Sequence, residues 1–108
     1  MQAVAPTLDD DQALRLADMF RLLGDASRLR ILLACLAQPT NVGTIAARAG
    51  LSLSLVSHHL RLLRAARLVR ATRQGKQVFY EGADDHVRRV VEDMVIHLSE
   101  PDEEDERP

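Results

Sequence analysis

Cysteine is nearly absent from this sequence: Cys35 is the only one among 108 residues. One cysteine cannot form a disulfide within the chain, and such usage is typical of a reducing compartment. No apolar run approaches the roughly 18 residues of a membrane span. The first residues, MQAVAPTLDDD, lack the basic start and apolar core of a secretory signal. We therefore expect a cytoplasmic protein with no membrane partner.

Acidic residues are missing from positions 52–80, although residues 12–99 as a whole carry seven of them and thirteen basic residues, a net charge of +6. The remaining acidic residues are concentrated at positions 9–11 and 100–106. A surface that is merely solvated usually mixes both signs of charge, so the acid-free stretch favours a polyanion, above all nucleic acid. Its basic residues are Arg61, Arg64, Arg67, Arg70, Arg73 and Lys76.

Catalytic motifs are also lacking. The sequence has no cleft-forming glycine-rich loop and no nucleophile motif, so we expect neither an enzyme nor a small organic substrate. The length suits one domain with a modest core. We expect a flexible N-terminal tail over residues 1–8, one domain over 9–100, and an acidic disordered tail over 101–108.

The periodicity of apolar residues predicts four helices, then a β-hairpin, then a last helix. Gly24 and Gly50 end the first and third helices, and Asp25 and Ser52 cap the second and fourth. On the fourth helix we expect four residues to face inward: Leu55, Val56, Leu60 and Leu63. The segments LVRATR and QVFYEG flank Gln74, Gly75 and Lys76, which is typical of a hairpin. Asp84 or Asp85 caps the last helix.

The central segments predict a helix-turn-helix, with helices over 42–49 and 53–64 and the turn Ala49-Gly50-Leu51. The hairpin directly after it makes a winged variant. The fold class is therefore mainly α (α+β), in the order α-α-α-α-β-β-α. The second helix would enter the major groove of DNA, and the wing would reach phosphates or the minor groove. The residues predicted to bind DNA are Ser54, Ser57, His58 and Arg61 on the helix and Arg73 and Lys76 on the wing.

His58 and His59 are adjacent, so on a helix they point about 100° apart and cannot chelate one ion together. We expect one of them to face DNA and the other to pack or cap locally. Cys35 lies among apolar residues and is expected to be a buried thiol without a redox role.

Three motifs, LGDASRLRILLACL, LSLSLVSHHLRLLRAARLV and RQGKQVFYEG, resemble the ArsR/SmtB family of bacterial metal-sensing repressors, and the resemblance runs from about residue 12 to residue 100. It implies a homodimeric winged helix-turn-helix protein, paired through its N- and C-terminal helices. Such a repressor controls genes for metal efflux or sequestration and leaves DNA when metal binds. Arsenic, lead and cadmium sensors of the family commonly carry Cys-x-Cys near the third helix. The segment NVGTIAARA has no cysteine here, which argues against a thiolate site for a soft metal.

The last helix, DDHVRRVVEDMVIHLSE, carries metal-binding residue types at both ends. Residues 84 and 97 lie on the order of 20 Å apart along a helix, too far to share an ion within one chain. A broad apolar stripe follows the helix, and the ionisable residues line one edge of it. If two copies pack antiparallel across a two-fold axis near residues 91–92, the N-terminal end of one helix meets the C-terminal end of the other, twice per dimer.

The predicted metal ligands are Asp84 and His86 from one chain with His97 and Glu100 from the other, and they match the C-terminal-helix zinc site of the family. Two imidazoles and two carboxylates suit tetrahedral zinc, with cobalt a close mimic. Asp93 lies on the same edge as an outer acceptor or an adventitious ligand. By linkage, metal that prefers the DNA-free dimer weakens DNA binding. We expect the coupling to run from His97 to a backbone carbonyl near Arg67.

Two other hypotheses remain open. One is a winged-helix regulator that responds to a non-metal signal or is constitutive, with both histidines simply solvated. The other is a zinc hydrolase, which a site closed by four protein ligands disfavours.

Overall fold

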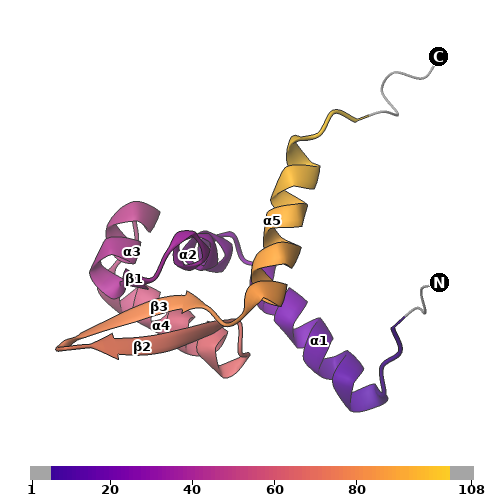
Figure 1. Ribbon diagram of the computed structural model, residues 1–108, viewed down its shortest axis with the longest axis horizontal. Coiled ribbons are helices and arrows are strands. Elements are labelled where there is room, and N and C mark those ends of the chain that lie inside the picture. The colour runs from indigo at the N-terminus through magenta and orange to yellow at the C-terminus, as the bar shows by residue number, and fades with distance from the viewer. Residues whose placement is uncertain (1–5, 103–108) are drawn as a thin grey trace.

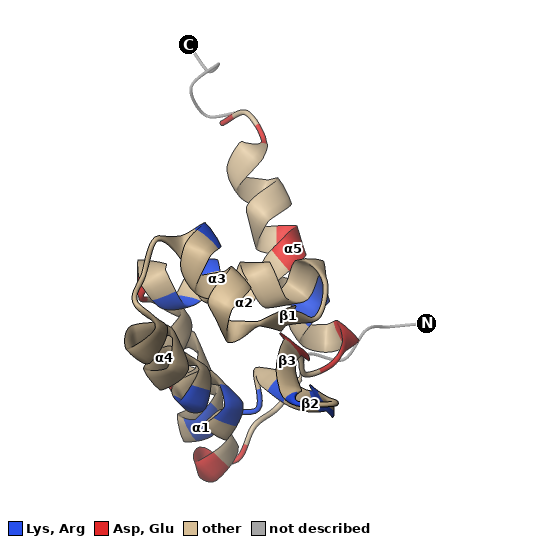
Figure 2. Ribbon diagram, turned by 90° about the vertical axis from the view of Figure 1, so that its left-hand side faces the viewer, with Lys and Arg blue, Asp and Glu red and all other residues tan. Residues whose placement is uncertain are grey.

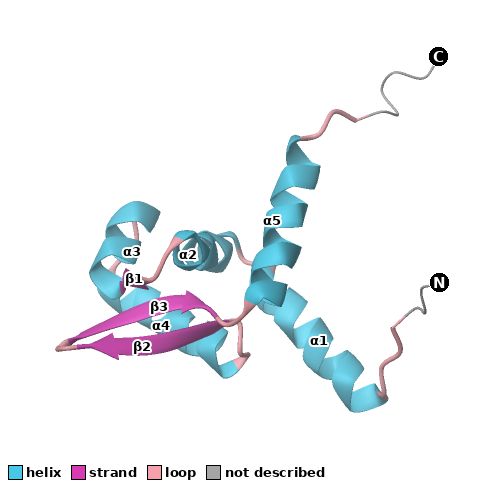
Figure 3. Ribbon diagram, viewed as in Figure 1, coloured by secondary structure: helices cyan, strands magenta, loops and turns pink. Residues whose placement is uncertain are grey.

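The computed structural model describes residues 6–102. The predicted N-terminal tail and acidic tail fall largely outside them; residues 6–8 and 101–102 lie outside any helix or strand and are exposed. The predicted order of helices and hairpin is confirmed, with one added strand (Figures 1 and 3). The elements are α1 (Asp10–Leu23), α2 (Ala26–Ala37), β1 (Thr40–Asn41), α3 (Val42–Ala49), α4 (Leu53–Ala65), β2 (Val69–Gln74), β3 (Gln77–Gly82) and α5 (Asp85–Ser99).

Short polar side chains begin the helices as predicted. The carboxylate of Asp25 accepts the backbone N–H of Arg28 at 3.0 Å, and the hydroxyl of Ser52 accepts that of Leu55 at 3.2 Å. Each cap satisfies a backbone donor that the first helical turn leaves without a partner. At α5 the cap is Asp84, not Asp85. Gly50 ends α3 with a φ of 68°, a left-handed conformation that glycine adopts without steric cost.

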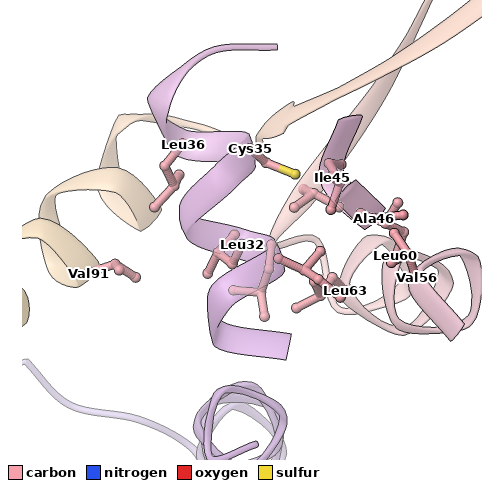
Figure 4. Packing of buried hydrophobic residues seen from close by; sticks show 12 residues of the cluster. Leu32, Cys35, Leu36, Ile45, Ala46, Val56, Leu60, Leu63 and Val91 are labelled. Carbon is pink, nitrogen blue, oxygen red and sulfur yellow. The ribbon is translucent and has the colours of Figure 1, made fainter. Parts of the chain in front are cut away.

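The core lies where α2, α3 and α4 meet, and Val91 of α5 joins it from one side (Figure 4). Val56, Leu60 and Leu63 are fully buried on α4, as predicted. Leu55, which we expected to face inward, is 39% exposed. One residue away from Val56 on a helix, it points about 100° off the core face. Helix α4 therefore has a narrower buried apolar face than its sequence indicates.

A two-residue strand, β1, was not predicted. It pairs antiparallel with β3, with Thr40 opposite Tyr80 and Asn41 opposite Phe79, so the sheet order is β1-β3-β2. Asn41 also caps α3 by accepting the N–H of Thr44 at 2.8 Å. Through this strand the start of the helix-turn-helix is hydrogen-bonded to the wing.

Two helices extend from the side of the molecule opposite the hairpin tip: α1 and α5 diverge there, as Figure 1 shows. Both carry large apolar side chains in contact with solvent: Leu14, Leu16 and Phe20 on α1, and Val90, Met94, Val95 and Leu98 on α5. An apolar surface of this extent marks a binding face. Within residues 6–102 no helix has the length and apolar character needed to cross a membrane.

Candidate functional site

The recognition helix α4 presents its predicted DNA-binding residues on the side away from the core. Ser54, His58 and Arg61 are exposed, and Ser57 is half-buried. These positions lie within about two and a half turns of the capped N-terminus of α4, the part of such a helix that meets base edges. Arg61 has no ion pair among the residues that the structure describes, which leaves its guanidinium available.

The hairpin tip carries the other two predicted DNA-binding residues. Arg73 lies near the end of β2, and Lys76 lies in the turn beside Gly75, whose φ is 64°. Both side chains are exposed. Gln74 pairs with Gln77, so the turn is shorter than expected and consists of Gly75 and Lys76 alone. The tip therefore projects two cations from a tight turn.

The two adjacent histidines of α4 differ as predicted. His58 is exposed, whereas His59 is only 8% exposed and faces the N-terminus of α2. Burial lowers the pKa of His59, although the nearby Asp25 carboxylate opposes this effect. Among residues 6–102, two buried side-chain nitrogens lack a hydrogen-bond partner, His59 Nδ1 and Arg28 Nε. The middle of α4 thus holds a buried imidazole that faces the start of α2.

We expect mild acid to destabilise the fold through His59. In the unfolded chain the imidazole has a pKa near 6.5, and in the folded chain burial depresses the pKa of His59. The unfolded state therefore binds more protons as the pH falls below about 6.5, and stability is lost down to the folded pKa. Urea unfolding at pH 7.5 and pH 5.5 measures this loss. His59→Gln should flatten the dependence, and an unchanged dependence would assign it to other groups.

The C-terminal end of α4 adopts an unusual backbone conformation. Arg67 has a φ of 63°, and it is the only non-glycine residue with positive φ among the described residues. Leu68 N–H bonds to the carbonyl of Leu63 at 2.9 Å, a hydrogen-bond pattern that closes a helix and usually places glycine at the left-handed position. The backbone carbonyl of Leu68 in turn accepts a hydrogen bond from the N–H of Ala83 at 3.1 Å. The segment that joins α4 to β2 is thus hydrogen-bonded to the residue directly before Asp84.

The predicted metal ligands form two separate half-sites, one at each end of α5. Asp84 and His86 are exposed at its start, and His97 and Glu100 are exposed at its end. Asp84 uses Oδ1 to accept the N–H of Val87 at 3.0 Å, which leaves its second carboxylate oxygen for another ligand. Within residues 6–102 no three His, Cys, Asp or Glu side chains of one chain come together to hold a metal. Each predicted half-site thus contains two of the four predicted ligands.

An apolar groove of about 380 Å³ lies between the C-terminal half of α5 and the α1–α2 corner. His97 shares its wall with Phe20, Met94 and Leu98. A second groove, of about 210 Å³, lies between α1 and the first turns of α5 and includes His86. Both predicted half-sites therefore border apolar surface that the chain itself leaves uncovered.

Sequence reasoning missed a hollow of about 560 Å³ beside the first half-site. Asp84 and His86 line it together with four arginines from three elements: Arg15 of α1, Arg64 and Arg67 at the end of α4, and Arg70 of β2. Figure 2 shows basic residues where α4 passes α1 and on β2. The acid-free stretch contained three of these arginines, but nothing in the sequence joined Arg15 to them.

Cys35 is fully buried in the core, and burial raises the pKa of its thiol to about 12. A thiol in this state is neither a nucleophile nor a metal ligand at neutral pH. Its predicted role as a small core residue fits this burial.

The sequence pattern of the bacterial regulatory proteins of the arsR family matches residues 25–71. The transcriptional repressor SmtB homolog of Synechocystis sp. is 44% identical over 92 residues, which cover 85% of this chain and 70% of that protein. The chain belongs to the ArsR family. Its relatives are transcriptional regulators, not enzymes, as predicted.

Solved structures of similar proteins share the fold. The solution structure of a homodimeric winged helix-turn-helix DNA-binding domain from Mycobacterium bovis superposes with a TM-score of 0.75 at 28% identity, covering 88% of this chain and 90% of that one. The cadmium metal-sensor CmtR of Mycobacterium tuberculosis gives 0.67 at 42% identity, covering 80% and 90%. The predicted winged helix-turn-helix class is confirmed, and the predicted partners, DNA and a second copy, are those named for the Mycobacterium bovis domain.

Proposed function

We propose that this ArsR-family regulator is a zinc-responsive repressor that acts in the cytoplasm. Its metal-free homodimer binds operator DNA, and zinc at two intersubunit sites releases the DNA and derepresses genes for metal efflux or sequestration. Cobalt is a chemical mimic of zinc at these sites. The observation that carries the proposal is the division of the donor set into two half-sites at opposite ends of one exposed apolar helix.

Antiparallel pairing of α5 would complete both sites at once. The end of one helix that bears Asp84 and His86 would meet the end of the other that bears His97 and Glu100. The exposed apolar residues between these ends, Val90, Met94 and Val95 among them, need a cover. A two-fold related copy covers its own equivalent surface in the same contact. The homodimer named for the Mycobacterium bovis domain supports dimerisation of this chain.

The donor chemistry favours zinc or cobalt over softer ions. Two imidazole nitrogens and two carboxylate oxygens suit a tetrahedral zinc ion, which would cross-link the two chains without redox chemistry. Cadmium, named for the related CmtR, prefers sulfur ligands. The single cysteine of this chain is buried and holds its proton, because the pKa of its thiol is raised to about 12.

The route from metal to DNA would run through the end of α4. Arg67, Asp84 and His86 line one hollow, and the Leu68 carbonyl accepts the N–H of Ala83. In the proposed pairing, His97 of one protomer arrives beside Arg67 of the partner subunit. A ligating imidazole usually donates its other N–H to a carbonyl. A backbone carbonyl near the left-handed Arg67 is the proposed acceptor, so metal binding would bias the pose of the recognition helix.

Operator binding measured by fluorescence anisotropy tests the proposal. An operator is first selected from random DNA with the metal-free protein, and its affinity is then measured with one equivalent per protomer of zinc, cobalt, nickel or cadmium. Zinc and cobalt should weaken binding by about 5- to 150-fold, the usual range of allosteric coupling. Equal affinity under all conditions would favour a regulator that answers to another signal or is constitutive.

We expect the wing and the recognition helix to contribute to DNA binding in different ways. Replacing Arg73 and Lys76 together by glutamine should weaken binding to all DNA sequences. Because the dimer has two wings, the change removes four cations and should lower the slope of log affinity against log salt by about 4. Arg61→Ala should instead cost about 1–3 kcal/mol for each half-site of the selected operator and relax its sequence preference. Arg30→Gln, an exposed change on α2, is the control. Equal effects of all three changes would contradict the predicted interface.

A further inference from the structure

The hollow beside Asp84 and His86 has an excess of positive charge. Four guanidinium groups line it against one carboxylate, that of Asp84, which also caps α5. Arg70 is held by Glu81 at 2.7 Å, and Arg15 lies 4.0 Å from Asp11. Arg64 and Arg67 have no ion pair within residues 6–102. Guanidinium groups gathered in this way suit a ligand with several carboxylates or phosphates.

A strongly acidic segment follows the other half-site. His97 and Glu100 line one hollow with Pro101 and Asp102 at the C-terminal end of α5. The sequence continues with Glu103, Glu104, Asp105 and Glu106. In the antiparallel pairing, Glu100 of one protomer lies beside Asp84 and His86 of the other. The acidic segment of each protomer therefore starts at the edge of its partner's arginine-lined hollow.

We propose that residues 103–106 of each protomer dock in the arginine-lined hollow of the partner subunit, where their carboxylates pair with the guanidinium groups of Arg64, Arg67 and Arg15. This inference rests on the antiparallel α5 pairing of the proposed function. The four carboxylates are opposite in charge to Arg64 and Arg67, which have no ion pair within residues 6–102. Six residues beyond Glu100 span on the order of 20 Å when extended, which is ample for a hollow that begins at the same half-site.

Attachment next to the hollow favours this occupant over a free anion. A segment tethered within a few residues of its site binds at an effective concentration in the millimolar range. A dissolved anion pays the full cost of association. Zinc that holds Glu100 of one protomer beside Asp84 of the other would keep the acidic segment in place. The segment would then neutralise arginines at the end of the recognition helix when DNA is released.

Disulfide trapping tests the docking in the full-length chain. Arg64→Cys combined with Glu104→Cys places both thiols in every protomer, and mild oxidation should give a covalent dimer on non-reducing gels. Arg48→Cys combined with Glu104→Cys is the matched control, because Arg48 is exposed on α3 and lies outside the hollow. We expect trapping at least about tenfold faster for the first pair. The buried Cys35, with the pKa of its thiol raised to about 12, does not compete.

Charge is tested separately from proximity. In the first pair, neutralising the remaining acids by Glu103→Gln, Asp105→Asn and Glu106→Gln should slow trapping several-fold, as should raising the salt concentration. Equal trapping of both pairs, or trapping indifferent to neutralisation and salt, overturns the docking. If the hollow instead holds DNA phosphates, Arg64→Gln weakens DNA binding while trapping stays at the control rate, which also overturns it.

Failure of the docking can be told apart from failure of the proposed function. Sedimentation of the untrapped protein reports whether the dimer forms, and anisotropy reports whether zinc weakens DNA binding. A dimer that answers to zinc but shows no selective trapping removes only the docking. A chain that traps selectively but ignores zinc removes only the metal-sensing function.

Discussion

His97→Gln is expected to give a dimer that binds its operator as tightly as the natural chain does but keeps it when zinc is added. Glutamine replaces the imidazole nitrogen that would ligate zinc and the second N–H that would reach the backbone near Arg67. Because the natural chain should lose about 5- to 150-fold in affinity, the variant should abolish nearly all of this change. Anisotropy with and without zinc, at fixed salt, gives both affinities.

A neighbouring acid provides the control for this variant. Asp85→Asn removes an exposed carboxylate one residue from Asp84, yet Asp85 neither caps α5 nor belongs to the predicted ligand set. Its zinc response should be that of the natural chain. A full zinc response in His97→Gln would remove His97 from both the metal site and the proposed relay.

Met94→Glu is expected to convert the dimer into monomers. Met94 is 63% exposed in the single chain and lies on the apolar face of α5, about one turn from the expected two-fold axis. Pairing would bury two carboxylates near each other, each at a cost of several kcal/mol without a partner charge. The dimerisation constant should therefore weaken by at least about a thousandfold. Sedimentation velocity at micromolar protein measures it, and operator binding should fall with it.

Ile96 offers a matched control on the same helix. It is 56% exposed, but at 100° per residue it lies nearly opposite the centre of the apolar stripe and lines none of the grooves around α5. Ile96→Glu makes a closely similar chemical change and should leave a dimer. Monomers from both variants, or from neither, would contradict pairing through the Met94 face.

The fold was predictable because its signals are local. Asp25, Ser52 and Asp84 cap helices through contacts three residues along the chain, and Gly50 and Gly75 mark positions with positive φ. Strand β1 was not predicted because a segment of two residues is too short to show an alternating pattern. Thr40 is buried and pairs with Tyr80, which is forty residues away, so the residues next to Thr40 in the sequence do not indicate its position. Leu55 was misplaced because helical spacing alone does not locate the edge of a buried face.

The candidate site was only partly predictable, for a related reason. Asp84, His86, His97 and Glu100 share one helix, so spacing and helical geometry related them directly. The arginine-lined hollow joins α1, α4 and β2, and no spacing rule relates Arg15 to Arg67. The contacts that complete each half-site would come from a second chain. In the sequence, only the apolar stripe of α5 indicates where that second chain lies.

The small strand β1 affects which operator spacing the dimer can bind. Because β1 is hydrogen-bonded to β3 and leads directly into α3, the wing and the helix-turn-helix of one protomer form a single DNA-binding unit. The two DNA-binding units of a dimer can bind both half-sites of an operator only when their separation matches the DNA helical repeat of about 10–10.5 base pairs. The pairing of the α5 helices would set that separation. The bound metal ion would then fix the two units at a separation that does not match the spacing of the operator half-sites.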